Sequence, residues 1–348
     1  MILTALLAVL VSGPALTPAP DAQIERHGDH LTLKGGIVWI NTDAFTDGVV
    51  SAELRLPATR GFTGLLFRAR DGLDGELIYL RHHQRGNPDA WQYHPRHNGH
   101  QAYQIYQGEG FAGTASWRVD EWIRVELHVA GDRAELFVDG ESIARVDDLQ
   151  TGRTSGRIGF WGLLGERDIR QVEIARTVPR LTQRQVDAPA EIEGALIESW
   201  DVSAPLPESA VAQAMTIADI TASAGDWTTV PATHRGIADL NTVAPLGPES
   251  DTVLARHTIE AAEAVPVLFD FGFSDRARVF LNGRLLYTGA DEFRSRDYRF
   301  LGTVGRYDTL VLPLQEGTNE LIVAVSETEG GWALTGALRT PGPASGHF

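Results

Sequence analysis

The sequence contains no cysteine and only two methionines among its 348 residues. Without cysteine there is no disulfide framework, no thiolate nucleophile and no zinc-thiolate site. No apolar run reaches the roughly 20 residues that a membrane-spanning helix needs. Basic residues are also scarce, because 30 Lys and Arg face 46 Asp and Glu and leave a formal net charge of -16. Such a charge repels nucleic-acid phosphates and anionic membranes, so neither is an expected partner.

Hydrophobic residues make up 43% of the chain, enough for real cores, and the length suits two domains of roughly 100–200 residues each. The charge divides unevenly between the two parts. Residues 24–180 hold 22 acids and 19 bases, a net of -3, whereas residues 195–342 hold 20 acids and 10 bases, a net of -10. The first part is therefore the better candidate for binding a neutral or anionic ligand.

The first residues resemble a secretory signal. An apolar run over residues 2–11 is followed by the small residues Ser12, Gly13 and Ala15, although no Lys or Arg precedes the run. We therefore expect residues 1–20 to form a signal peptide. Export without disulfides, in an acidic chain, favours a bacterial periplasmic or secreted location.

Short β-like segments separated by Gly, Asp and Asn turns dominate residues 24–178. In residues 122–130 apolar side chains alternate with polar ones, which is typical of a strand with one buried face. The sequence predicts a β-sandwich with strands at residues 31–33, 48–56, 64–70, 76–83, 101–107, 122–130, 133–138 and 156–160.

Residues 179–196 contain two prolines and little that could pack, which predicts a linker. A second β-rich domain is expected over residues 197–342. Its strongest signal is Asn282-Gly283, because a type I′ turn needs positive φ at both central residues. We also expect a helix over residues 208–219 and a packed Trp332. The expected strands are residues 265–273, 277–282, 284–287, 309–314 and 320–326.

The most unusual segment, residues 82–100, concentrates five histidines with two aromatic residues and several amides. We interpret it as a polar loop. Sugars offer apolar ring faces and a rim of hydroxyls, so stacking rings and hydrogen-bonding side chains would suit a glycan. A solvated loop without a ligand is the open alternative. The predicted ligand-binding residues, on this segment and the strands beside it, are Arg68, Arg81, Trp91, Gln92, Tyr93, Asn98 and Gln104.

The same segment offers a candidate metal site, because the neutral imidazoles of His94, His97 and His100 suit zinc, copper or nickel. On a strand His97 would face away from the other two histidines, so only a loop could bring all three together. Calcium in the turn from Asp71 to Glu76 is a further alternative. The sequence indicates no other cofactor.

The first region carries the motifs Gly64-Leu-Leu-Phe-Arg-Ala69, Trp122-Ile-Arg-Val-Glu-Leu-His-Val129 and Gly156-Arg-Ile-Gly-Phe-Trp161. Through them residues 31–178 resemble the concanavalin A-like, laminin-G-like jelly roll. The glycosidases of that fold are marked by an ExDxE or ExDxxE strand, and neither occurs in this sequence. The related 3-keto-disaccharide hydrolase domain is a closer analogy for an exported bacterial chain. Its Asn-Ser-Gly motif is replaced here by Phe62-Thr-Gly-Leu-Leu-Phe67, so its activity is not carried over.

The second region contains the hairpin from Phe273 to Tyr287, the turn from Leu314 to Leu321 and the triplet Gly330-Gly-Trp332. Through these segments residues 197–340 are similar to galactose-binding-like jelly rolls, such as the sugar-binding domains attached to many glycosidases. The expected fold class is therefore all-β, with two tandem β-sandwich (jelly-roll) domains.

Three functions fit these patterns. The first is an exported, non-catalytic carbohydrate-binding protein whose partner is a glycan or polysaccharide. It is favoured because the sequence has no HExxH helix, no GxSxG elbow and no Walker loop. The second is a glycan-processing hydrolase or lyase related to 3-keto-disaccharide hydrolases, with a histidine base or a histidine-bound metal. The third is a structural or adhesive module that binds proteins.

Overall fold

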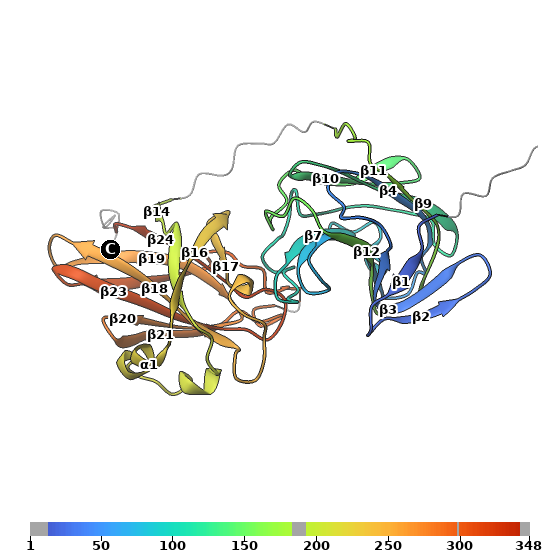
Figure 1. Ribbon diagram of the computed structural model, residues 1–348. Coiled ribbons are helices and arrows are strands. Elements are labelled where there is room, and N and C mark those ends of the chain that lie inside the picture. The colour runs from blue at the N-terminus through green and yellow to red at the C-terminus, as the bar shows by residue number, and fades with distance from the viewer. Residues whose placement is uncertain (1–12, 183–192, 298, 342–348) are drawn as a thin grey trace, which may run out of the picture. The chain divides into compact units, whose positions relative to one another are not determined.

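The computed structural model describes residues 13–182, 193–297 and 299–341. Strands account for nearly all of the regular structure, which confirms the all-β class. The described residues divide into two compact units, the first made of residues 13–95 and 108–182, the second of residues 96–107 and 193–341. In Figure 1 the strands of the first unit run from blue to green and those of the second from yellow to red. No helix among the described residues is long and apolar enough to cross a membrane.

The first unit is a sandwich of two antiparallel sheets that share the long strand β3. Residues 31–33 of β3 pair with β13 in the back sheet, and residues 36–39 pair with β12 in the front sheet. The front sheet has the order β3-β12-β5-β6-β7-β8, and the back sheet has the order β3-β13-β4-β9-β10-β11. The strands are β1 (Leu16–Pro18), β2 (Gln23–Arg26), β3 (Leu31–Ile40), β4 (Gly48–Arg55), β5 (Phe62–Ala69), β6 (Gly75–Arg81), β7 (Trp91–Arg96), β8 (Ala112–Gly113), β9 (Trp122–Ala130), β10 (Arg133–Val138), β11 (Glu141–Val146), β12 (Arg157–Leu163) and β13 (Arg167–Ala175), with a 3-10 turn η1 (His82–Gln84).

The second unit repeats this plan with β16 as the shared strand. Its ladder has the order β21-β20-β23-β18-β15-β16-β17-β24-β19-β22, and the aromatic core includes Trp200, Phe271 and Trp332. The elements are β14 (Ala195–Leu196), β15 (Ser199–Ser203), η2 (Glu208–Ala210), α1 (Ala218–Ser223), β16 (Trp227–His234), β17 (Ile237–Asp239), η3 (Leu240–Thr242), β18 (Thr252–Ala261), β19 (Val265–Ser274), β20 (Arg276–Leu281), β21 (Arg284–Ala290), β22 (Asp308–Leu314), β23 (Gly317–Ser326) and β24 (Ala333–Arg339).

Alternation and turn chemistry predict most of these strands well. The Asn282-Gly283 turn joins β20 to β21 with φ values of 49° and 81°, as a type I′ turn requires. Trp332 is fully buried, as expected. The helix expected over residues 208–219 is wrong, because η2 and α1 are short and separate. The strand expected over residues 101–107 is also wrong, because this segment forms turns.

The polar loop expected over residues 82–100 differs most from the structure. Residues 91–96 form strand β7, and all six of its residues are buried. From Arg96, the last residue of β7, to Gln107 the chain belongs to the second unit, whereas the sequence placed this segment in the first domain. Several polar side chains of this stretch, Gln92, His94, Arg96, His100 and Gln104 among them, are therefore buried and not part of a solvated loop.

Gln104 anchors residues 96–107 in the second unit. Its side-chain oxygen accepts a hydrogen bond from Ser274 Oγ at 2.9 Å, and its amide nitrogen donates to the carbonyl oxygen of Leu301 at 3.1 Å. Its backbone NH donates to Gly330 O, and its carbonyl accepts from Val304 NH, each at 2.9 Å. Tyr106 adds a bond from its hydroxyl to Asp239 at 3.0 Å. The segment is thus an integral part of the second unit's core.

We expect the substitution Gln104→Leu to lower the free energy of unfolding of the second unit by about 1–3 kcal/mol, because the half-buried Leu301 carbonyl loses its donor and the buried Ser274 hydroxyl loses an acceptor. The matched change Gln101→Leu, at a half-buried glutamine, should stay within about 0.5 kcal/mol. Hydrogen exchange followed by mass spectrometry on peptides from each unit measures the effect. Faster exchange confined to the first unit would contradict the assignment of this segment.

Candidate functional site

One face of the front sheet carries a cluster of aromatic side chains. Side chains at alternate positions of a strand point to opposite faces, so Trp39, Tyr79 and Trp161 share one face while their strand neighbours share the other. Together with their apolar neighbours they form one cluster of buried residues. The three rings are only 3–5% exposed. They therefore stabilise the sheet and do not offer an open stacking surface. The cluster comprises Ile37, Trp39, Leu66, Ala69, Leu77, Tyr79 and Trp161.

Glycine makes room for these rings. Gly64 lies directly between Trp161 and Tyr79 in the strand register, and the two rings meet edge to face with centroids 5.6 Å apart. A Cβ atom at Gly64 would lie 2.6 Å from the Cβ of Tyr79 and 2.3 Å from a backbone oxygen. In the same way Gly159 lies opposite Trp39, where a Cβ would lie 2.9 Å from the indole. Both glycines are needed because a side chain at either position would collide with the aromatic residue or the backbone of the neighbouring strand.

An open groove of about 450 Å³ lies at the end of this aromatic face. Its walls come from the end of β3, the end of β5 and the start of β12, so three neighbouring strands of the front sheet position it. Ala69 belongs to both the groove and the aromatic cluster. The guanidinium of Arg157 lies 3.9 Å from the centre of the Trp39 ring and joins the two regions. The groove is lined by Ile40, Asn41, Thr42, Ala44, Ala69, Arg70, Arg153, Ser155, Gly156 and Arg157.

Arg68, a residue predicted to bind ligand, lies behind this groove. It is 3% exposed and donates to Thr46 O at 3.1 Å, to Arg153 O at 3.1 Å and to Asp47 Oδ1 at 2.8 Å. In return, Nε of Arg153 donates to the carbonyl oxygen of Arg68 at 2.9 Å. Arg68 therefore positions the loop that carries Arg153.

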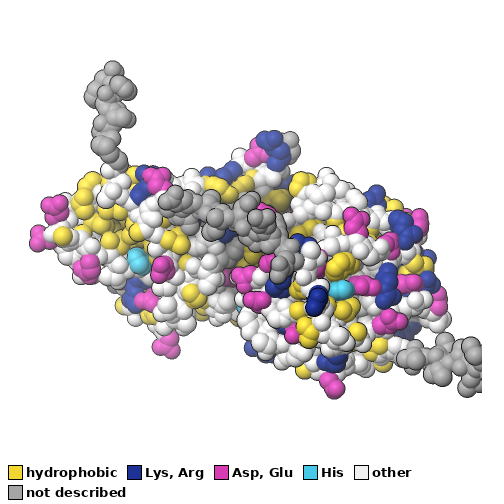
Figure 2. Space-filling model, turned by 90° about the horizontal axis from the view of Figure 1, so that it is seen from above, with side chains coloured by type: hydrophobic (Ala, Val, Ile, Leu, Met, Phe, Trp, Pro, Cys, Tyr) yellow, Lys and Arg dark blue, Asp and Glu magenta, His cyan; other side chains and the backbone are white. Residues whose placement is uncertain are grey.

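The groove is basic in an acidic chain. Arg70 is balanced by ion pairs with Asp71 and Asp74. Arg153 and Arg157 form no ion pair with a carboxylate among the described residues. On the surface that Figure 2 presents, acidic and basic side chains are interspersed, without one large patch of either sign. Arg153 and Arg157 therefore give the groove two guanidinium groups that no described carboxylate pairs with.

The predicted residues on β6 and β7 are brought close together. Gln92 is 3% exposed, and its side-chain oxygen accepts a 2.5 Å hydrogen bond from Tyr79 on the neighbouring strand. Arg81 is half-buried and forms an ion pair with Asp89. Trp91 is 6% exposed. Their role in ligand binding stays a prediction, and Gln92 and Arg81 already have protein partners.

Tyr93 and Glu76 form a buried pair inside the first unit. The tyrosine hydroxyl donates to Glu76 Oε2 at 2.6 Å and accepts from the backbone NH of Gln150 at 2.8 Å. Thr151 donates to the other carboxylate oxygen through its NH and its hydroxyl. Burial raises the pKa of Glu76, and the bonds from Thr151 and Tyr93 oppose that shift. The pair holds the 148–151 loop against β6.

The remaining predicted residues belong to the second unit. Asn98 donates to the carbonyl oxygen of Asn241 at 2.8 Å. Gln104 is fully buried in the contacts described above. His100 lies 2.8 Å from the carbonyl oxygen of Ala244, and burial lowers its pKa. The structure therefore does not assemble the predicted ligand-binding residues within one unit.

The three predicted metal ligands are also divided, because His94 lies on β7 in the first unit while His97 and His100 lie in the second. No group of three or more His, Asp or Glu among the described residues is placed to hold a metal ion. In the turn proposed for calcium, Asp71 accepts the backbone NH groups of Leu73 and Asp74. The carboxylate of Asp71 therefore stabilises the turn through these hydrogen bonds.

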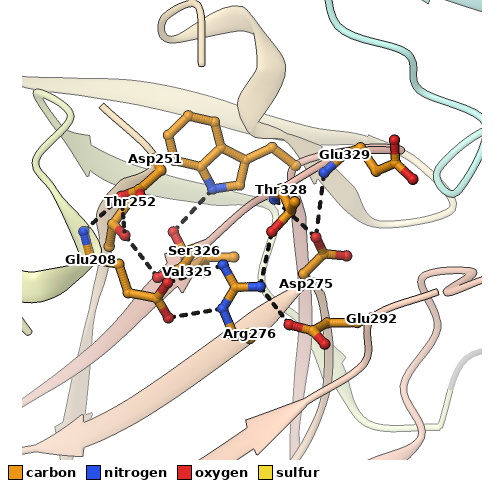
Figure 3. A network of polar contacts seen from close by, with 11 residues as sticks. Glu208, Asp251, Thr252, Asp275, Arg276, Glu292, Val325, Ser326, Thr328 and Glu329 are labelled. Atoms are coloured by element: carbon orange, nitrogen blue, oxygen red, sulfur yellow. Dashed lines mark hydrogen bonds and ion pairs between the residues drawn. The ribbon is translucent and has the colours of Figure 1, made fainter. Parts of the chain in front are cut away.

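The second unit contains a cluster of buried acids near the start of β20. Figure 3 shows the guanidinium of Arg276 between Glu208 and Glu292, with Asp275 accepting the backbone NH groups of Thr328 and Glu329. The same guanidinium forms two bonds of 2.8 and 3.0 Å to Glu208. These contacts fix the loop that follows β23.

Glu327 lies beside this network with one unsatisfied oxygen. Its Oε1 accepts from the NH of Gly331 at 3.1 Å, whereas Oε2 is buried without a hydrogen-bond partner among the described residues. Burial, and after it the charge of Asp275, raises the pKa of Glu327 to about 8. The side chain is therefore mostly protonated at neutral pH, which reduces the cost of its burial.

Comparison with known proteins finds one family model that matches the first part of the chain. Residues 20–175 match the family model of the 3-keto-alpha-glucoside-1,2-lyase-like domain, which is less than half of the chain. No curated protein matches the sequence.

Similar solved structures cover just under half of the chain. One is the carbohydrate binding module CBM66 from Bacillus subtilis, at 13% identity, covering 47% of this chain and 96% of that one with a TM-score of 0.36. Another is a putative glycosyl hydrolase from Parabacteroides distasonis, at 13% identity, covering 47% and 93% with a TM-score of 0.34. A third is a Bacillus subtilis protein of unknown function with a galectin-like fold, at 15% identity, covering 48% and 90% with a TM-score of 0.33.

Sequence reasoning missed the residues that form the groove. Trp39 and Arg157 are 118 positions apart, and their stacking depends on the pairing of β3 with β12. A usable signal exists in the pattern, because Ile37 and Trp39 are two residues apart on β3, and Gly159 and Trp161 are two residues apart on the strand that Arg157 begins. Those positions share one face by period-two alternation.

We expect the stability of the second unit to fall between about pH 5 and pH 8. The folded state holds the proton of Glu327 up to about pH 8, above the ordinary value of 4.5. The stability that this group supplies is complete below pH 4.5 and is lost as the pH rises toward 8. In Glu327→Gln this fall should be weaker. Urea unfolding at pH 5, 6, 7 and 8, followed by circular dichroism, measures it.

The control is Glu316→Gln, which removes an exposed carboxylate from the turn before β23 and should keep the wild-type pH dependence. Parallel profiles for the wild type and Glu327→Gln would contradict the assignment of the titrating group.

Proposed function

We propose that this chain is an exported, non-catalytic carbohydrate-binding protein whose binding site is the groove of the first unit. The observation that carries the proposal is the groove itself, where the guanidinium of Arg157, stacked on the buried Trp39, adjoins a rim of hydrogen-bonding groups. Pockets of roughly 300–1,000 Å³ accommodate small ligands, and about 450 Å³ falls within that range.

The chemistry of the rim suits sugar hydroxyls. Asn41, Thr42 and Ser155 offer both donors and acceptors. Arg176 donates to Thr42 Oγ1 at 2.7 Å and to the carbonyl oxygens of Asp43 and Ala44, so the outer rim is fixed in place. A rim that is ordered before binding lowers the entropy cost of ligand capture.

The lining of the groove supports binding over catalysis. None of its ten described residues is Asp, Glu or His. Hydrolysis or elimination of a glycoside needs a positioned acid or base, and arginine, threonine and serine supply neither at neutral pH without a partner. The match of residues 20–175 to a lyase-like family favours a second candidate, a glycan-processing enzyme. Release of a product from a bound glycan would distinguish it.

Export is part of the proposal. Residues 1–12, which carry the apolar run of the expected signal peptide, lie outside the described residues. Strand β1 pairs with β3 from Leu16 onward, so cleavage at or before Ala15 would keep this strand in the mature protein. The identity of the first residue of the secreted chain, read by mass spectrometry, tests this part.

We expect the substitution Ala44→Trp to weaken glycan binding by about tenfold or more, because a large side chain at this exposed groove residue would occupy the ligand's space without changing the charge. The measurement is a glycan screen, with affinities of the bound glycans determined by calorimetry. The control Ala58→Trp places the same side chain at an exposed position before β5, at the other end of that strand. Failure of the wild type to bind any glycan would contradict the proposal.

A further inference from the structure

The two arginines of the groove without acidic partners restrict what the groove can bind. Arg157 is exposed, and the one described contact of its side chain is the stacking over Trp39 at 3.9 Å. Stacking uses the face of a guanidinium and leaves its N–H donors in the plane of the group. These donors therefore remain available to a ligand that approaches in that plane.

Arg153 is held in a complementary way. Its Nε donates to Arg68 O at 2.9 Å, and its own carbonyl accepts from the buried Arg68 at 3.1 Å. The terminal nitrogens of Arg153 have no hydrogen-bond partner among the described residues. Both guanidinium groups are thus ordered through contacts that do not use their outer donors, and ordered donors bind an anion with less loss of side-chain entropy.

We propose that the groove recognises the carboxylate of an acidic sugar, that is, a glycan containing uronic acid. The proposal rests on the proposed function of the same groove. A planar carboxylate matches the fork of a guanidinium with two parallel hydrogen bonds. The sugar hydroxyls would then meet Asn41, Thr42 and Ser155 on the rim.

The net charge of the whole chain limits which anionic ligands can bind. With a net charge of -16, the protein repels a long, densely charged polyanion at distance. The groove is small, and the attraction of its arginines acts only over a short range. It therefore favours a ligand with one or a few carboxylates carried on sugar rings. Screening at physiological salt, with a Debye length of about 8 Å, lets the local arginines act on a ligand that has reached the groove.

The test compares matched ligands on the full-length protein. Short oligomers of galacturonic, glucuronic and mannuronic acid are titrated by calorimetry, each beside its own methyl ester, which keeps the sugar and removes the charge. We expect at least one acid to bind about tenfold or more tightly than its ester, a difference of about 1.4 kcal/mol or more. Equal binding of the acids and the esters would overturn this inference and leave the proposed function intact.

Variants locate the effect. Arg157→Gln should weaken binding of the acid about tenfold and leave binding of the ester nearly unchanged. Arg60→Gln removes the same charge just before the start of β5, away from the groove at the strand's other end, and should leave both unchanged. If the two variants behave alike, the specific role of Arg157 is overturned.

Two further results of the experiment distinguish an anion site without sugar recognition from a groove that binds no glycan. Inorganic sulfate up to millimolar concentration should compete poorly, and competition as strong as that of the uronate would show an anion site without sugar recognition and overturn the proposal. Absence of binding for every acid, ester and neutral glycan would overturn the proposed function together with the inference.

Discussion

The buried guanidinium of Arg68 is the constraint on which the groove of the first unit depends. It bonds two backbone carbonyls and one carboxylate, from segments before β4 and before β12, at a backbone position with φ of 47° that L-residues rarely adopt. A charge of this kind, 3% exposed, is stable in the interior only while its donors are satisfied. The loops it joins therefore have one arrangement, and that arrangement places Arg153 and Ser155 beside the end of β3. The residue thus determines the shape of the groove without lining it.

The second unit deals with buried charge differently. It buries several carboxylates near one end of the sandwich and balances them with Arg276, with backbone NH groups and with protonation. Arginine partners and NH donors favour the charged form, whereas burial favours the neutral one. Asp275 accepts two NH groups but has a raised pKa, because burial outweighs them. The two sandwiches share a plan of two sheets joined by one strand. The described buried charges of the second are mostly carboxylates, whereas those of the first combine the arginines Arg68 and Arg167 with the glutamates Glu76 and Glu135.

How much of the fold and of the groove could be predicted depends on how far apart in the sequence the interacting residues lie. Alternation over residues 122–130 and the Asn282-Gly283 turn are local, and both were predicted correctly from neighbouring residues alone. Strand β7 was missed because its polar side chains suggest a surface loop, and their burial depends on partners such as Tyr79 and Glu76 on β6. The position of residues 96–107 could not be predicted at all, because the atoms that satisfy Gln104 lie about 170 to 226 residues further along the chain. The groove was missed for the same reason, since its walls come from strand ends distant in sequence.

The place of residues 96–107 in the second unit also determines the order in which the protein can be completed during synthesis. Gln104 leaves the ribosome long before Gly330, its hydrogen-bond partner in the last turn before β24. At about 5–20 residues per second, the segment waits roughly 10–45 s for that partner. During this interval residues 97–107, which lie between β7 and β8 in the sequence, have not yet met their partners in the second unit. Their polar groups are therefore hydrogen-bonded to water. The hydrogen bonds of Gln104 can therefore form only after most of the second unit has been synthesised, although Gln104 itself is translated between two strands of the first unit.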